Sequence, residues 1–148
     1  MTRRSIYLFI AGLFLVTVTS AQNPNVERLN AYKIGFITKR INLTPQEAEK
    51  FWPVYNDYQE LKYKIQRERQ DINKNFNQNE NSISDQEMIK AADRIIELQV
   101  SEAALAKDFH GKVKTILSPY KVLRLYQAEN QYRMQLLKEL QERKQLKN

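Results

Sequence analysis

The sequence predicts an all-α fold of four helices, in which two long kinked helices form an elongated hairpin and a shorter helix lies at each end. Apolar residues recur at steps of three and four along most of the chain, which is the spacing of an amphipathic helix. No segment shows the strict alternation of a strand. Two corners also carry helix-start signals, and their residues are Leu43, Thr44, Pro45, Gln46 and Glu47 at the first, and Leu117, Ser118 and Pro119 at the second.

Residues 1–21 are predicted to be a signal peptide. Arg3 and Arg4 form a basic start, residues 6–18 form an apolar run, and small residues end at Ala21, as a signal peptidase requires. The apolar run is shorter than the roughly 20 residues that span a bilayer as a helix. We therefore expect cleavage after about Ala21, rather than an uncleaved anchor, and export of the mature chain. Residues 22–148 would form a single helical domain.

Composition argues against catalysis. The chain has no cysteine and one histidine, His110, and it lacks a glycine-rich phosphate loop. His110 falls on an apolar helix face, where a packing role is the ordinary one. We expect no enzyme activity, no metal and no cofactor. The 24 Lys and Arg residues are interspersed with 17 Asp and Glu residues, which indicates solvated helix faces with a weak positive field, not a nucleic-acid site.

The first helix is expected over residues 23–41 and the second from the first corner to about Phe76. At the corner, Thr44 can cap the second helix, Pro45 suits its first position, and Glu47 can complete a capping box. Gly35 in the first helix indicates either a close helix approach or a tolerated weak point. Pro53 predicts a kink.

An asparagine-rich segment, residues 73–82, predicts the hairpin loop, because asparagine side chains compete with helical hydrogen bonds. Ser84 and Glu87 predict a second capping box, for a third helix ending at Ile116. Such a helix would be on the order of 50 Å long, which favours an elongated hairpin or a dimer. Its expected inner face includes Met88, Ala92, Ile95, Gln99, Ala103, Ala106, His110, Val113 and Leu117, with Leu98, Leu105, Phe109 and Ile116 widening it on one side.

The fourth helix is predicted to start at Ser118 and Pro119, although Lys121 stands where a capping-box acid would be. Residues 138–148 are mostly charged and are expected to fray.

The first part of the expected second helix, residues 51–69, combines aromatic and basic residues. Its rings fill either the junction of the first, second and fourth helices or a face that receives another protein, and both uses are compatible on different faces of one helix. The candidate binding residues are Phe51, Trp52, Tyr55, Tyr58, Lys62, Arg67 and Arg69.

At its two corners the chain resembles the periplasmic Spy/CpxP-like family, which is named for its LTxxQ motifs. The first corner, LTPQE at 43–47, has Glu47 for the motif's last glutamine, and the second, LSPYK at 117–121, departs further. Related sequences with an FWPVY-like continuation, here residues 51–55, are often labelled sensors of extracytoplasmic-function sigma factors.

The resemblance implies a cradle-shaped homodimer acting as an ATP-independent chaperone on unfolded or misfolded envelope proteins. The alternative is an envelope-stress sensor that binds one specific membrane signalling partner.

Overall fold

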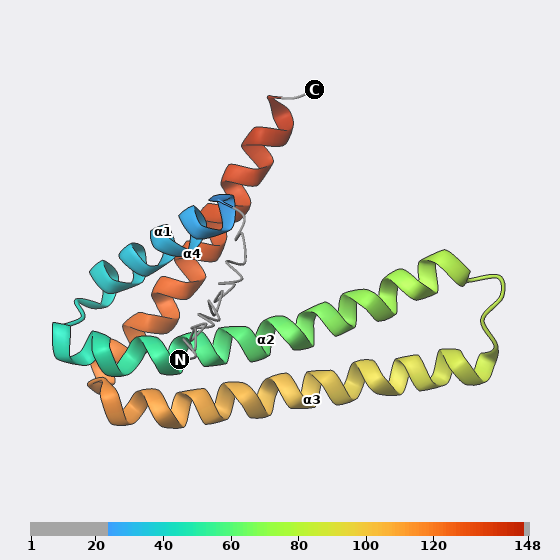
Figure 1. Cartoon of the computed structure of the whole chain (residues 1–148), viewed down its shortest axis with the longest axis horizontal. Helices are drawn as coiled ribbons and strands as arrows, with labels where there is room; N and C mark the ends of the chain where they lie inside the picture. The colour runs from blue at the N-terminus through green and yellow to red at the C-terminus, as the bar shows by residue number, and fades with distance from the viewer. Residues whose placement is uncertain (1–23, 147–148) are drawn as a thin grey trace, which may run out of the picture.

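The computed structural model describes residues 24–146, which form four helices: α1 (Pro24–Ile41), α2 (Pro45–Asn79), α3 (Asp85–Ile116) and α4 (Pro119–Gln145) (Figure 1). This part of the chain contains no strand, so the all-α prediction and the number of helices are confirmed. The predicted signal peptide, residues 1–21, lies outside the described residues.

The helices form two antiparallel pairs, α2 with α3 and α1 with α4. Figure 1 shows that the pairs meet at the end of the molecule that holds both corners and diverge from there as a fork. The α2–α3 hairpin is one arm of the fork, and the α1–α4 pair is the other. Both corners therefore lie at the point where the arms diverge.

The first corner is a helix stop followed at once by a helix start. Asn42 adopts a left-handed φ of 52°, and the Leu43 and Asn42 N–H groups donate to the carbonyls of Thr38 (3.1 Å) and Lys39 (3.4 Å), a Schellman ending. The Glu47 N–H then donates to Thr44 Oγ1 (3.2 Å), and the Thr44 N–H donates to Glu47 Oε2 (2.8 Å). The predicted capping box is confirmed.

The second corner begins α4 as predicted, with Ser118 as the N-cap and Pro119 in the first turn. Its local cap is weak, because the Lys121 N–H lies 3.5 Å from Ser118 Oγ. The Lys121 side chain instead reaches the first corner, where its Nζ donates to Glu47 Oε2 and to the Asn42 carbonyl. A tertiary contact thus takes the place of the local acid.

The core lies where the four helices meet. Rings from α2 and α3 fill its centre, and Tyr58 stacks on Phe109 with 4.2 Å between centroids. Burial of this apolar surface is the main stabilising term for the fork. The buried residues are Ile37, Ile41, Phe51, Tyr55, Phe109, Val113, Leu117, Val122, Leu125 and Ala128.

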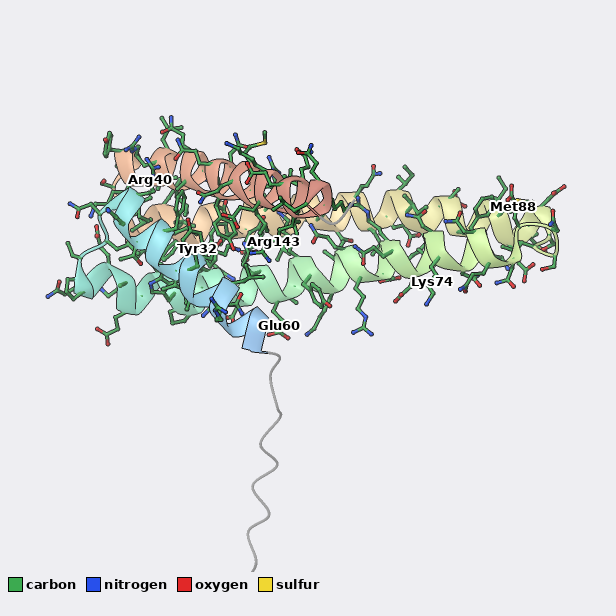
Figure 2. All side chains as sticks on the ribbon, turned by 90° about the horizontal axis from the view of Figure 1, so that it is seen from above. Tyr32, Arg40, Glu60, Lys74, Met88 and Arg143 are labelled. Carbon is green, nitrogen blue, oxygen red and sulfur yellow. The ribbon has the colours of Figure 1, made fainter. Side chains whose placement is uncertain are left out.

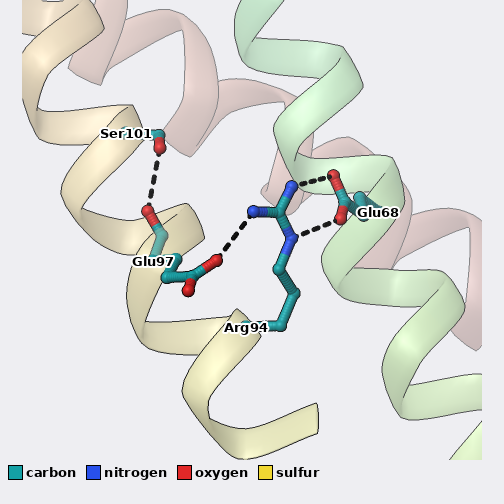
Figure 3. Close-up of polar contacts among 4 residues, drawn as sticks. All are labelled: Glu68, Arg94, Glu97 and Ser101. Carbon is teal, nitrogen blue, oxygen red and sulfur yellow. Dashed lines mark hydrogen bonds and ion pairs between the residues drawn. The ribbon is translucent and has the colours of Figure 1, made fainter. Parts of the chain in front are cut away.

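The far half of the hairpin extends beyond α1 and α4, as the region around Lys74 and Met88 shows in Figure 2. Leu98 is buried there, and ion pairs supplement it. Arg94 makes a two-pronged contact with Glu68 of α2 (2.7 and 3.1 Å) and a third bond to Glu97 (2.9 Å) (Figure 3).

The predicted hairpin loop at residues 73–82 was wrong for most of its length, because α2 continues to Asn79. The Asn79 side-chain amide donates to the Asn75 carbonyl (3.0 Å) and to Asn75 Oδ1 (2.8 Å). These bonds run along the helix, so the side chains do not break it. The turn occupies residues 80–84, and the predicted Ser84–Glu87 capping box is confirmed.

The inner face of α3 matches the predicted one in part. Leu98, Phe109 and Val113 are buried, as predicted. Gln99 and Ala103, near the middle of the predicted face, are exposed instead. Alanine fits an outer helix face as well as an inner one, which is why spacing alone placed Ala103 on the wrong face.

Two further expectations are settled by the helices themselves. The helix α4 continues to Gln145, so the predicted fraying from Lys138 was wrong as far as the structure describes the chain. Most residues of this segment are good helix formers, and the Leu146 N–H donates to the Glu142 carbonyl.

A Cβ added at Gly35 of α1 would meet nothing within 4 Å, so Gly35 is a weak point of the helix and not a site of close helix approach. The helix α2 continues across Pro53.

Candidate functional site

A groove of about 490 Å³ lies in the fork between the two arms, with walls from α1, α2 and α4. We call it the fork groove. Its cations are Lys33, Lys62 and Arg133, its rings are Tyr63, Tyr126 and Tyr132, and its remaining residues are Gln59, Gln66, Glu129, Asn130 and Leu136.

A hydrogen-bonded network forms part of this groove. Glu129 Oε1 accepts from the Tyr55 hydroxyl (3.0 Å) and from Gln59 Nε2 (3.4 Å). Gln59 Oε1 accepts from Lys33 Nζ (3.1 Å), which joins α1 to α2. Burial, together with the Glu129 charge, raises the pKa of Tyr55 well above its ordinary value, so its hydroxyl keeps its proton and acts as a donor.

The surroundings of Lys33 in the fork groove differ from those of an ordinary surface lysine. It is half-buried, and its Nζ lies 5.0 Å from the centroid of the Tyr55 ring and 5.9 Å from that of Tyr132. Burial lowers the pKa of Lys33, the charge of Glu129 raises it, and the charge of Lys62 lowers it further. The fold therefore holds this positive charge in a place that does not favour it.

The predicted aromatic binding residues differ in how deeply they are buried. Phe51 (0% exposed) and Tyr55 (2% exposed) belong to the core, and Trp52 and Tyr58 are half-buried against it. The junction that these rings fill includes α3 through Phe109, in addition to the helices expected from the sequence. A partner can therefore touch only the outer edges of this cluster.

The basic residues among the predicted binding residues also lie in different places. Lys62 lines the fork groove and lies 5.7 Å from the Tyr58 ring. Arg67 is exposed. Arg69 Nη1 donates to Glu102 Oε2 (2.8 Å), which makes it a clamp between α2 and α3. The structure thus brings Lys62 into the groove and leaves the two arginines on the hairpin.

The sequence reasoning missed Lys33, Tyr132 and Arg133. They come from α1 and α4, far from the aromatic segment in the chain, and only the packing of α1 on α4 and α2 brings them to Lys62. The available signal was weak: a lysine on the apolar side of the first helix, next to Tyr32.

Two other grooves lie away from the predicted binding residues. One, of about 450 Å³, lies near the hairpin turn between Phe76 and Met88. The other, of about 570 Å³, lies at the second corner beside His110, whose Nδ1 is 2.8 Å from the Tyr126 hydroxyl. His110 is half-buried and hydrogen-bonded in this position.

Within residues 24–146, no group of three or more His, Cys, Asp or Glu side chains is placed to hold a metal ion. None of the helices in that range is both long and apolar enough to cross a membrane.

No protein-family model, curated protein or solved structure matches this chain. The fold and the groove define an all-α protein made of two antiparallel helix pairs with a basic, tyrosine-lined groove between them. The resemblance to the Spy/CpxP-like family stays a prediction from the corner motifs.

Proposed function

We propose that this protein is an exported, ATP-independent binding protein of the periplasm that holds unfolded or stressed envelope proteins. The observation that carries the proposal is the fork groove, which places three cations beside three tyrosine rings in one concave surface. Extended polypeptide offers both apolar side chains and carboxylates to such a surface. The proposed location rests on the predicted signal peptide.

Exposed apolar residues outside the groove support the same proposal. Val100 is 65% exposed and Ile96 is 58% exposed on the hairpin. An unfolded client presents many short apolar segments, so scattered partial contacts suit a holding function better than one tight fit.

We also propose a homodimer. The helix α4 carries Leu123, Met134 and Leu137 on a face that α1 does not cover, and each is about half exposed or more. Sedimentation equilibrium on residues 22–148 tests this proposal. A monomer at concentrations where clients are held would rule out a cradle built from two chains.

The test of the holding function is aggregation of an unfolded client. Purified residues 22–148 at a stoichiometric amount should slow light scattering by several chemically unfolded clients, without nucleotide. No slowing with any of them would exclude the proposal.

A second candidate function is a sensor that binds one membrane signalling partner. The hydrogen bonds that join Lys33, Gln59, Glu129 and Tyr55 favour it, because a groove with fixed side chains suits one specific partner. A pull-down from envelope extract separates the two. Many weakly bound clients support the holding protein, and one stoichiometric membrane partner supports the sensor.

A further inference from the structure

Three cations converge on the fork groove from three different helices: Lys33 from α1, Lys62 from α2 and Arg133 from α4. Within the described part of the chain, none of the three has a carboxylate oxygen within 4.0 Å. Arg133 Nη2 donates to Asn130 Oδ1 (2.7 Å), and Lys33 donates to Gln59. The hydrogen-bond partners of Lys33 and Arg133 are thus neutral amides.

The groove has one carboxylate of its own, Glu129, and it is already engaged. Its Oε1 accepts bonds from the Tyr55 hydroxyl and from Gln59. The remaining balance is three positive charges against one negative charge. Like charges in a partly desolvated groove repel one another more strongly than they would in open water.

Burial is the main reason that the pKa of Lys33 is lowered; the charge of Glu129 opposes this effect, and the charge of Lys62 adds to it. A carboxylate placed among the three cations would relieve the repulsion and accept charge-assisted hydrogen bonds, and the guanidinium of Arg133 can make two in parallel. Binding of a carboxylate in the fork groove would therefore offset an unfavourable interaction of the free protein.

We infer that the fork groove is a carboxylate subsite, which takes the side chain of an aspartate or glutamate in an extended segment of a bound polypeptide. The exposed rings of Tyr63 and Tyr126 would contact the apolar neighbours of that acid. The inference rests on the proposed function and narrows it to clients with acidic residues flanked by apolar ones.

The experiment compares two capped, fluorescein-labelled peptides that contain leucine and phenylalanine around a single glutamate or a single glutamine. Fluorescence anisotropy with residues 22–148 should show about tenfold tighter binding of the glutamate peptide, a ratio typical of charge-assisted hydrogen bonds. The triple variant Lys33→Gln, Lys62→Gln, Arg133→Gln should bind the two peptides equally.

A matched control removes the same charge elsewhere. Lys74, Lys90 and Arg143 are exposed and lie outside the groove, so the triple variant Lys74→Gln, Lys90→Gln, Arg143→Gln should keep the preference for glutamate. If the groove triple variant does not fold, as judged by circular dichroism, Lys62→Gln alone should reduce the preference several-fold.

The outcomes separate the two proposals. Equal binding of both peptides by the unaltered protein would overturn the carboxylate subsite and leave polypeptide holding intact. Binding of neither peptide, together with no slowing of client aggregation, would remove both. An equal loss of preference in both triple variants would assign the effect to overall charge and overturn the subsite. Tight binding to phosphatidylglycerol vesicles without a peptide preference would assign the groove to lipid headgroups and also overturn it.

Discussion

Lys121 Nζ lies 2.6 Å from Glu47 Oε2 and 2.7 Å from the Asn42 carbonyl oxygen, and these contacts connect the two corners of the fork. Both side chains are mostly buried, with 18% and 21% of their surface exposed. Glu47 also closes the capping box of α2, so one carboxylate serves a local bond and a tertiary one. The contact joins the α1–α2 and α3–α4 connections at the point where the arms diverge.

Breaking this contact should destabilise the whole fold. Lys121→Met keeps the length of the side chain and removes its charge, and we expect a loss of about 1.5–3 kcal/mol in the free energy of unfolding, typical of hydrogen bonds to charged groups. Urea denaturation measures it. Lys112→Met is the control, because Lys112 makes only an exposed i,i+4 pair with Asp108, and it should change stability little. Equal effects of the two substitutions would contradict a special role for Lys121.

The same carboxylate predicts a dependence on acid. The hydrogen bond from Lys121, followed by that from the Thr44 backbone, lowers the pKa of Glu47 below its ordinary value of 4.5. A lowered carboxyl pKa stabilises the fold above pH 4.5, and this contribution is lost as pH falls through the folded-state value. Glu47→Gln should therefore flatten the fall in the urea midpoint between about pH 5 and pH 3. Glu49→Gln, at an exposed neighbouring position, should leave that slope unchanged.

The core prediction concerns Phe109. Its ring stacks on Tyr58 and meets Tyr55 edge-on at 6.0 Å between centroids. Phe109→Ala should cost about 3–5 kcal/mol, the usual range for removing a buried ring, and should weaken the junction of the two arms. Val100→Ala, at a site 65% exposed on the same helix, serves as the control and should cost little. A comparable loss in both would contradict the position of the core.

Gly35 offers a stabilising substitution. It lies inside α1, its φ is negative, and a Cβ there would meet nothing within 4 Å. Gly35→Ala should therefore raise stability by about 0.8–1 kcal/mol, because alanine loses less backbone entropy in a helix. Thermal unfolding followed by circular dichroism measures the change. A lower melting temperature would show that α1 needs glycine for a contact that this structure does not contain.

The two hairpin arginines should behave differently. Arg67→Glu changes an exposed charge outside the fork groove and should leave both stability and the preference for glutamate peptides unaltered. Arg69→Glu places a negative charge against Glu102, so it should speed amide hydrogen exchange in the far half of the hairpin. Hydrogen exchange measured by mass spectrometry separates these effects. Equal exchange in both variants would mean that the Arg69–Glu102 pair does not hold α2 to α3.

Much of the fold was predictable because its signals are local. Thr44 with Glu47, and Ser84 with Glu87, are capping boxes between residues three apart, and their hydrogen bonds form in the structure as predicted. Pro45 and Pro119 fix where α2 and α4 begin. The weaker predictions failed where residues tolerate two environments: Asn75 and Asn79 bond along a helix as readily as in a loop, and Ala103 suits either face of α3.

The candidate site was only partly predictable. Lys62 belongs to the aromatic segment and was found, whereas Lys33 and Arg133 come from helices at opposite ends of the sequence. Phe51 and Tyr55 were candidates for binding because a sequence of rings does not show which of them face a core.

The sequence by itself determined the four helices, the starts of α2, α3 and α4, and the two corners, since each depends on hydrogen bonds and spacings within a few residues. The tertiary structure alone decided that Lys121 bonds to Glu47 instead of capping its own helix, and that three distant cations share one groove. Both follow from the angle between the two arms, which is set by the packing of Phe51, Tyr55 and Phe109 and is not encoded in any single segment.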